Sequence, residues 1–283
     1  FIILLIANAG IAALMAYMLF ETVVRFLIVR NFVRSWFSNN GYKIDNKPVF
    51  DRPIFRVIWS STWKLGGIFW GNYMINYGNS IIISQGNNPA MIASFLFTQR
   101  IVNFIRNISQ APFYANVPKI YNLTAQKNNI VLKLKTSEYI FSSLFILAFA
   151  LLVFGLSGNQ LLNLLNVETR LVPPLILFIM SITVLAEMHA GFHSNLYIST
   201  NEVPFLWPTL ISGVLILVMG FMAMPVWGIL GIVLVQFVVQ LSFNNWYPVY
   251  LSLRLLDWPL TRYLKDVNTF GFTFLIKKAT LRK

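Results

Sequence analysis

The sequence predicts an all-α protein that crosses a membrane several times. Of its 283 residues, 57% are apolar and only 11% are charged, and the mean hydropathy is +0.66. An average soluble domain has roughly 45–50% apolar and about 25% charged residues. The apolar residues gather into stretches of about 20, the length with which a helix crosses the roughly 30 Å hydrocarbon layer. These observations exclude a soluble enzyme and a disordered tail that binds nucleic acid.

About seven apolar stretches are long enough to span a bilayer. They cover approximately residues 1–20, 57–77, 89–111, 137–157, 171–192, 205–224 and 226–246. The first begins at residue 1 without a Met or a polar leader, which is unlike a signal peptide. We therefore expect the chain to begin inside a larger protein. The last two stretches are separated by little more than Pro225.

The basic residues of the predicted loops collect on one side of the membrane. They lie after the first span, after the third span and after the last span: Arg30, Arg34, Lys43, Lys47, Arg52, Arg56, Lys119, Lys127, Lys133, Lys135, Arg254, Arg262, Lys265, Lys277, Lys278, Arg282 and Lys283. Only Arg170 lies on the other side. Because cytoplasmic loops collect Lys and Arg, we expect a cytoplasmic C-terminus.

The formal net charge of +13 therefore fits membrane topology, and no nucleic-acid partner is expected. Membrane lipids are the expected partners of the basic tail after the last span. This tail, residues 249–283, mixes Leu and aromatic residues with Arg and Lys. It either lies at the cytoplasmic interface as an amphipathic helix or contains a short helix that caps the core.

The predicted span 89–111 carries a polar, cationic stripe. A sector about 120° wide on its helical wheel contains Gln99, Arg100, Asn103, Arg106, Asn107 and Gln110. Arg100 lies near the midpoint of the span and Arg106 about 9 Å nearer the cytoplasm. A charge at a helix centre costs on the order of 2.5–3.5 kcal/mol and usually faces a bundle interior or a wet cavity. Arg100 either does so or pairs with Glu187, whereas Arg106 has snorkelling or a headgroup phosphate as its alternative.

The predicted span 57–77 has a weaker polar face about 180° wide. Its members are Ser60, Ser61, Lys64, Gly67, Gly71, Asn72 and Asn76. Lys64 is a third cation in a predicted span. It either faces the bundle interior or snorkels to the interface, because it lies about two turns from the start of the span.

Acidic and imidazole groups are rare in the predicted spans. His189 and His193 have the i, i+4 spacing that can hold a metal, but Glu187 points 120–160° away and the chain has no Cys. We therefore predict neither a metal site nor a cofactor. Glu187 is a candidate proton or cation site, or the counter-charge of an arginine. Glu21 and Arg25, four residues apart, should form a local ion pair.

Motifs of known enzyme classes are absent from the sequence. It has no phosphate-binding loop, dinucleotide fingerprint, kinase or hydrolase motif, and no paired acidic cluster. A polytopic enzyme of polysaccharide synthesis would carry a sizeable loop on the side of its chemistry, yet the longest predicted external connection has about 13 residues. We therefore do not expect an enzyme.

Two consecutive segments resemble the seventh and eighth helices of O-antigen and polysaccharide flippases. These segments are RPIFRVIWSSTWKLGGIFWGNYMINYGNSIIIS and NNPAMIASFLFTQRIVNFIRNISQAPFYANVPKIYNLTAQKN. The likeness lies in the Gly-rich first helix with Tyr and Asn, the polar turn, the internal arginines and the Pro118–Lys119 exit into a basic loop. The family belongs to the multidrug/oligosaccharidyl-lipid/polysaccharide exporter superfamily.

The resemblance implies a two-lobe, alternating-access transporter of the bacterial inner membrane. Residues 1–29 would be the last helix of the first lobe, 30–56 a cytoplasmic linker, 57–248 the second six-helix lobe and 249–283 the cytoplasmic tail. The rest of an N-terminal lobe would be missing from this chain. A polysaccharide polymerase and a chain-length protein would be possible further partners.

The resemblance also implies the cargo, an undecaprenyl-diphosphate-linked oligosaccharide of O-antigen lipopolysaccharide or another surface polysaccharide. Arginine binds diphosphate oxygens by bidentate hydrogen bonds, and amides can bind sugar hydroxyls. We expect Arg100, Arg106 and, more weakly, Lys64 to contact the diphosphate. The predicted sugar path consists of Asn72, Asn76, Asn103, Asn107 and Gln110. Glu187 is the candidate for ion coupling on this half.

Two other functions stay open at this point. A multidrug exporter of the same superfamily would share the topology, but a carrier of organic cations needs buried carboxylates and Glu187 is the one obvious candidate. A membrane scaffold or partner that transports nothing is the third possibility. In that case the polar stripe would serve as a seam between helices.

Overall fold

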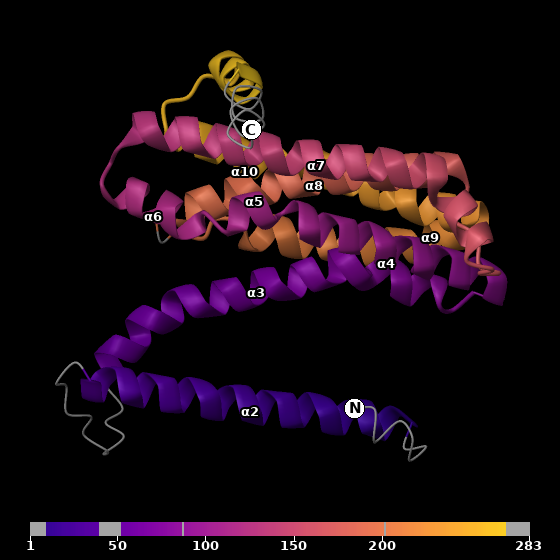
Figure 1. Cartoon of the computed structure of the whole chain (residues 1–283), viewed down its shortest axis with the longest axis horizontal. Coiled ribbons are helices and arrows are strands. Elements are labelled where there is room, and N and C mark those ends of the chain that lie inside the picture. Colours follow the sequence, from indigo (N-terminus) through magenta and orange to yellow (C-terminus); the bar gives the residue numbers. More distant parts are fainter. Residues whose placement is uncertain (1–9, 40–51, 87, 201, 270–283) are drawn as a thin grey trace. The chain divides into compact units, whose positions relative to one another are not determined.

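The structure is a computed structural model that describes residues 10–39, 52–86, 88–200 and 202–269, and all regular secondary structure in these ranges is helical. This confirms the all-α class (Figure 1). The α-helices are α2 (Gly10–Asn39), α3 (Arg52–Ile83), α4 (Pro89–Ser109), α5 (Ala111–Tyr114), α6 (Val117–Ala125), α7 (Asn129–Leu164), α8 (Pro174–Ile198), α9 (Leu206–Val239) and α10 (Tyr247–Leu255). A π-helical turn, η1 (Gln240–Asn244), joins α9 to α10, and the backbone is helical again over 260–269.

The chain divides into two compact units, Phe1–Phe55 and Arg56–Lys283. In the first unit, the predicted ion pair between Glu21 and Arg25 is confirmed. Helix α2 continues to Asn39, so it extends about ten residues into the expected linker 30–56. Residues 1–9 and 40–51, which belong to the predicted first span and linker, lie outside the described residues.

Among the described residues, three helical segments are long and apolar enough to cross a membrane: Asn129–Leu164, Pro174–Ile198 and Leu206–Leu255. They contain most of the predicted spans 137–157, 171–192, 205–224 and 226–246. The predicted spans 57–77 and 89–111 are helical as α3 and α4 but are not among the three. Their Arg, Lys, Asn and Gln side chains explain this, because they lower the mean hydropathy of every stretch of these helices that is long enough to span a membrane.

Helix α9 folds back on itself within its length. Gly228 has φ 57° and ψ −140°, a left-handed conformation that L-residues with a side chain rarely adopt. The turn therefore lies just after the predicted position, and Pro225 stays within the helix. The two arms pack together through Ile216 of the first arm and Val235 of the second, which form one buried cluster with Ile75 of α3.

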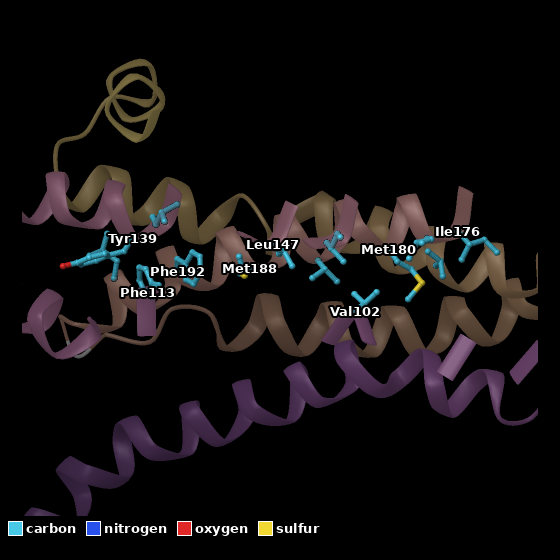
Figure 2. Close-up of a cluster of buried hydrophobic side chains, with 14 of the residues drawn as sticks. Val102, Phe113, Tyr139, Leu147, Ile176, Met180, Met188 and Phe192 are labelled. Atoms are coloured by element: carbon cyan, nitrogen blue, oxygen red, sulfur yellow. The ribbon is translucent and has the colours of Figure 1, made fainter. Parts of the chain in front are cut away.

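The main core of the second unit lies between α4, α7, α8 and the short helices α5 and α10 (Figure 2). Phe113 and Phe192 stack with their ring centroids 4.2 Å apart, and both side chains are fully buried. Helix α7 also presents exposed large apolar residues such as Phe149, Leu152 and Leu156, a surface suited to lipid contact.

Two glycines bring α3 against the first arm of α9. A Cβ atom at Gly71 would lie 2.8 Å from the carbonyl oxygen of Thr209, and one at Gly213 would lie 2.9 Å from the carbonyl oxygen of Gly71. Small residues of this kind let membrane helices approach closely. Because of this crossing, the polar residues that follow Gly71 on α3 reach the centre of the bundle.

Candidate functional site

The centre of the candidate site is an ion pair between α4 and α8. Nη1 of Arg106 lies 3.2 Å from Oε2 of Glu187, and the two side chains are 21% and 8% exposed. Taking two charges out of water is costly, and only good geometry with further hydrogen bonds compensates for it. The neighbours of the pair therefore decide whether it is stable.

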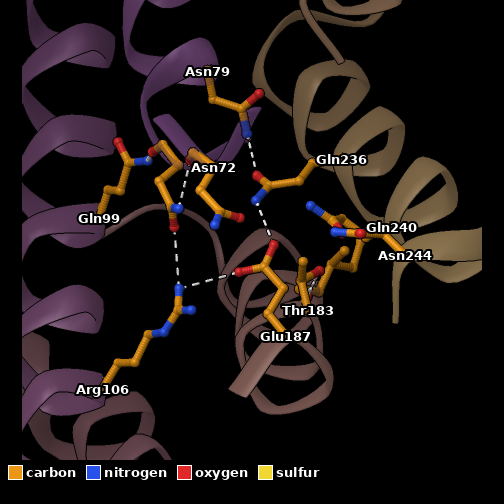
Figure 3. A network of polar contacts seen from close by, with 11 residues as sticks. Asn72, Asn79, Gln99, Arg106, Thr183, Glu187, Gln236, Gln240 and Asn244 are labelled. Carbon is orange, nitrogen blue, oxygen red and sulfur yellow. Dashed lines mark hydrogen bonds and ion pairs between the residues drawn. The ribbon is translucent and has the colours of Figure 1, made fainter. Parts of the chain in front are cut away.

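Amide side chains complete the hydrogen bonding of this pair (Figure 3). Nε2 of Gln236 on α9 donates to Oε1 of Glu187 at 3.0 Å, and Nη1 of Arg106 also donates to Oδ1 of Asn76 on α3 at 3.1 Å. Asn79, one turn further along α3, donates to Oε1 of Gln236. Four helices thus contribute to one network around the carboxylate.

The network is also fixed to the α3 backbone. Gln99 of α4 donates to the carbonyl oxygen of Asn76 at 3.0 Å and accepts a hydrogen bond from Ser80. Nδ2 of Asn76 donates to the carbonyl oxygen of Asn72 at 2.7 Å. These contacts hold the Asn76 amide with its oxygen toward Arg106.

A cavity of about 20 Å³ lies inside the network. It is lined by Asn103 and Thr183 in addition to the ion pair, Asn76, Gln99 and Gln236. Such a volume holds about one water molecule when polar groups surround it. Oδ1 of Asn79 is buried without a hydrogen-bond partner in the described part of the chain, as is Nε2 of Gln240 nearby.

The structure brings together four of the residues predicted from the sequence: Asn76, Asn103, Arg106 and Glu187. Of the alternatives left open, Glu187 is the counter-charge of an arginine, and that arginine is Arg106 rather than Arg100. Arg106 does not snorkel away, since its guanidinium points to Glu187 and Asn76.

Arg100 differs from Arg106 although both lie in the predicted stripe. Arg100 is exposed, and within the described residues its side chain has no hydrogen bond or ion pair. Six residues at about 100° each leave the two side chains about 120° apart around α4. Arg106 therefore faces the bundle interior, whereas Arg100 lies on the exposed side of α4. The predicted polar stripe is not one continuous surface.

The side chains of the remaining predicted site residues lie outside the network. Lys64 is partly exposed and lies about 18 Å before Asn76 along α3, at 1.5 Å per residue. The side chains of Asn72 and Asn107 are exposed. Gln110 is partly exposed at the end of α4, where its backbone N–H bonds to the carbonyl oxygen of Arg106.

Gln236 and Asn79 were not predicted as site residues. Gln236 is the one polar side chain between Ile229 and Val239. A polar residue isolated in an apolar helix could have indicated that Gln236 belongs to the site. Asn79 lies just beyond the predicted end of the span at residue 77, whereas α3 continues to Ile83. The error at a predicted helix end therefore hid one member of the network.

A second polar cluster lies further along α8, where His189 and His193 are directed at the segment after α10. Nε2 of His189 is 2.6 Å and Nε2 of His193 is 3.0 Å from the hydroxyl of Tyr263, and Nδ1 of His193 is 2.5 Å from the hydroxyl of Ser252. Among the described residues, no group of three His, Cys, Asp or Glu side chains could hold a metal. The two imidazoles bind the 260–269 helix to α8.

Comparison with known proteins gives no relative of this chain. No family model, no curated protein and no solved structure matches it. Any functional argument therefore depends on the residues and on the geometry of the site.

Proposed function

We propose that the chain is part of an alternating-access carrier that flips an undecaprenyl-diphosphate-linked oligosaccharide across a bacterial inner membrane. In this proposal, residues 57–248 form its second lobe, and a first lobe completes the transport path. The proposal joins the resemblance of α3 and α4 to polysaccharide flippases with the charged network in the bundle.

The observation that carries the proposal is the Arg106–Glu187 pair, set among amides between apolar helices. Ionisable side chains within membrane helices are costly, and they commonly mark substrate or ion pathways. A scaffold could reach the same fold with apolar residues at lower cost. The amide groups around the pair are also suited to sugar hydroxyls.

The geometry supports a mechanism in which partners exchange. A diphosphate that reaches Arg106 would replace the carboxylate of Glu187, because arginine binds phosphate oxygens through two parallel hydrogen bonds. Glu187 would then have Gln236 as its remaining partner and would need a proton or another cation. Binding of cargo and uptake of a proton would thus be linked at one residue.

The cavity of about 20 Å³ is far too small for a saccharide. Cargo would enter only after α3 or α4 moves away from α8, as alternating access requires. Exposed polar residues on α3 and α4, such as Arg100, Asn107 and Asn72, would meet the headgroup before this opening. In this proposal Arg100 makes the first phosphate contact and Arg106 makes the central one.

A gene deletion in the source organism tests the function. We expect loss of surface polysaccharide and accumulation of its lipid-linked precursor, with rescue by the wild-type gene. Arg106→Gln and Glu187→Gln should fail to rescue at normal protein levels in the membrane. The matched control is Arg170→Gln, which removes an exposed arginine whose side chain bonds to Asn163, outside the network, and it should rescue fully.

Other outcomes would support the other functions. A deletion strain with normal polysaccharide and increased sensitivity to organic cations would indicate a multidrug exporter and contradict the proposal. Full rescue by both network variants would indicate that the ion pair is structural, as in a scaffold.

A further inference from the structure

A large apolar groove lies at the end of the second unit that carries its basic residues. It has a volume of about 780 Å³, within the range of small-molecule sites. One wall comes from α8, η1 and α10, with Leu241, Trp246 and Val249, and the opposite wall from Trp258, Pro259 and Leu260. Nothing in the described part of the chain fills it.

The second wall is held in place by the polar cluster on α8. Tyr263, 2% exposed, bonds to His189 and His193 at 2.6 Å and 3.0 Å. The ring of Trp258 packs edge-on against Tyr263, and its Nε1 donates to Oδ2 of Asp266 at 2.9 Å. The groove is therefore built from fixed elements and does not depend on a loose tail.

Cations border this groove. Arg254 lines it and is exposed, and its side chain has no hydrogen bond or ion pair within the described residues. Nζ of Lys133 at the start of α7 donates to the carbonyl oxygen of Asp257 at 3.1 Å, which places a second cation at the same end. Asp257 is the acidic residue of the lining, so the two cations leave a positive balance.

We propose that this groove binds an anionic phospholipid, with one acyl chain between the two walls and the phosphate at Arg254. The apolar lining suits an acyl chain, and the positive balance selects an anionic headgroup over a zwitterionic one. The inference requires only that the chain lies in a bilayer, and it is independent of any transported cargo.

Two further apolar grooves serve as internal controls. One, of about 660 Å³, lies between the arms of α9 near Trp207 and Phe243, and another, of about 300 Å³, lies between α7 and α8 near Leu152 and Phe178. Neither has a charged side chain in its lining. Lipid contact there should not depend on headgroup charge.

Photolabelling of the whole protein in phosphatidylcholine vesicles tests the proposal. The probes are phosphatidylglycerol and phosphatidylcholine, each with a diazirine in one acyl chain, and labelled peptides are mapped by mass spectrometry. One surface cation changes the binding of an anionic lipid by about five-fold. We expect this ratio between the two probes in peptides from residues 249–260, a segment that lines the proposed groove and neither control groove. A ratio of about one is expected in peptides from 204–219 and 148–185, which line the control grooves.

Arg254→Gln should bring the ratio in residues 249–260 close to one. Arg262→Gln, which removes an exposed arginine outside the groove lining, should leave the ratio unchanged. In the unmodified protein, 1 M salt should lower the ratio, because the Debye length falls to about 3 Å. A wild-type ratio of one overturns the proposal, as does an equal loss in both variants or a ratio that salt does not change.

Discussion

Helix α8 carries two polar clusters, one at Glu187 and one at His189 and His193, and the buried polar groups find different kinds of partner in the two. At Glu187 a charge is balanced by an arginine and amides from three other helices, around a cavity of about 20 Å³. The two ring nitrogens of His193 hydrogen-bond to the hydroxyls of Ser252 and Tyr263, and the imidazole has no exposed surface. The first cluster connects side chains of four helices, whereas the second connects α8 to α10 and to the 260–269 helix.

The largest expected effect concerns the charged cluster. Glu187→Leu leaves the partly buried Arg106 without its ion-pair partner and should destabilise the protein by about 3–5 kcal/mol. The double variant Arg106→Met with Glu187→Leu should recover most of this loss, since neither charge remains. Thermal unfolding in detergent measures both effects.

Glu21→Leu is the control for this prediction, because it breaks the more exposed pair with Arg25. Its melting temperature should stay close to that of the wild type. A double variant no more stable than Glu187→Leu would show that the pair itself is not the source of the loss.

The next effect concerns the helix crossing that positions the charged cluster. Gly71→Leu would drive a side chain into the Thr209 backbone and should cost about 1–3 kcal/mol. Gly66→Leu is the matched control, since no atom lies within 4 Å of a Cβ there. Hydrogen exchange should increase in α3 and the first arm of α9 but not in α10. Equal exchange in α10 would contradict the separation of the two clusters.

A smaller effect is expected at the neutral cluster. Tyr263→Phe removes the hydroxyl shared by two imidazoles and should cost about 1–2 kcal/mol. Trypsin should then cut faster at Arg262 and Lys265. Tyr250→Phe, at a half-exposed residue, serves as the control. Unchanged cleavage in Tyr263→Phe would show that the hydroxyl does not hold the 260–269 helix.

The smallest effect is a pH dependence of the same cluster. Burial raises the pKa of Tyr263 above its ordinary value of 10.0. The unfolded chain therefore loses this proton at lower pH than the folded protein, so the stabilisation is present below about pH 10 and is lost above it. The difference in melting temperature between wild type and Tyr263→Phe should be constant from pH 8 to 9.5 and shrink at higher pH. A constant difference up to pH 11 would contradict this.

The sequence predicts the helices well, because apolar stretches of membrane length leave little else for the backbone to form. It predicts Glu187 and Arg106 as site residues for the same reason, since a charge stands out in an apolar helix. It does not predict which arginine meets Glu187. That choice depends on the rotation of α4, and a wheel sector of about 120° does not fix this rotation.

The features that the sequence did not predict depend on contacts between segments distant in the chain. Tyr263 becomes a partner of His189 and His193 only because α10 folds back along α8, and no local pattern contains this information. Gly71 and Gly213 were visible as small residues, but their pairing is set by the crossing of α3 and α9. Errors in the predicted helix ends account for one further missed residue, because Asn79 lies beyond the predicted span end at residue 77.

The order in which the ion pair is synthesised has a consequence for biogenesis. Helix α4 is not among the three helical segments whose length and hydropathy are sufficient for a membrane span. It also precedes α8 in the chain, so it leaves the ribosome earlier. If α4 crosses the membrane, as the proposed function requires, Arg106 enters it before Glu187 has been synthesised, and Gln236 follows later still. We expect the insertion machinery to hold α4 until Glu187 has been synthesised. The position of Glu187 in the chain would then determine when α4 is released into the bilayer.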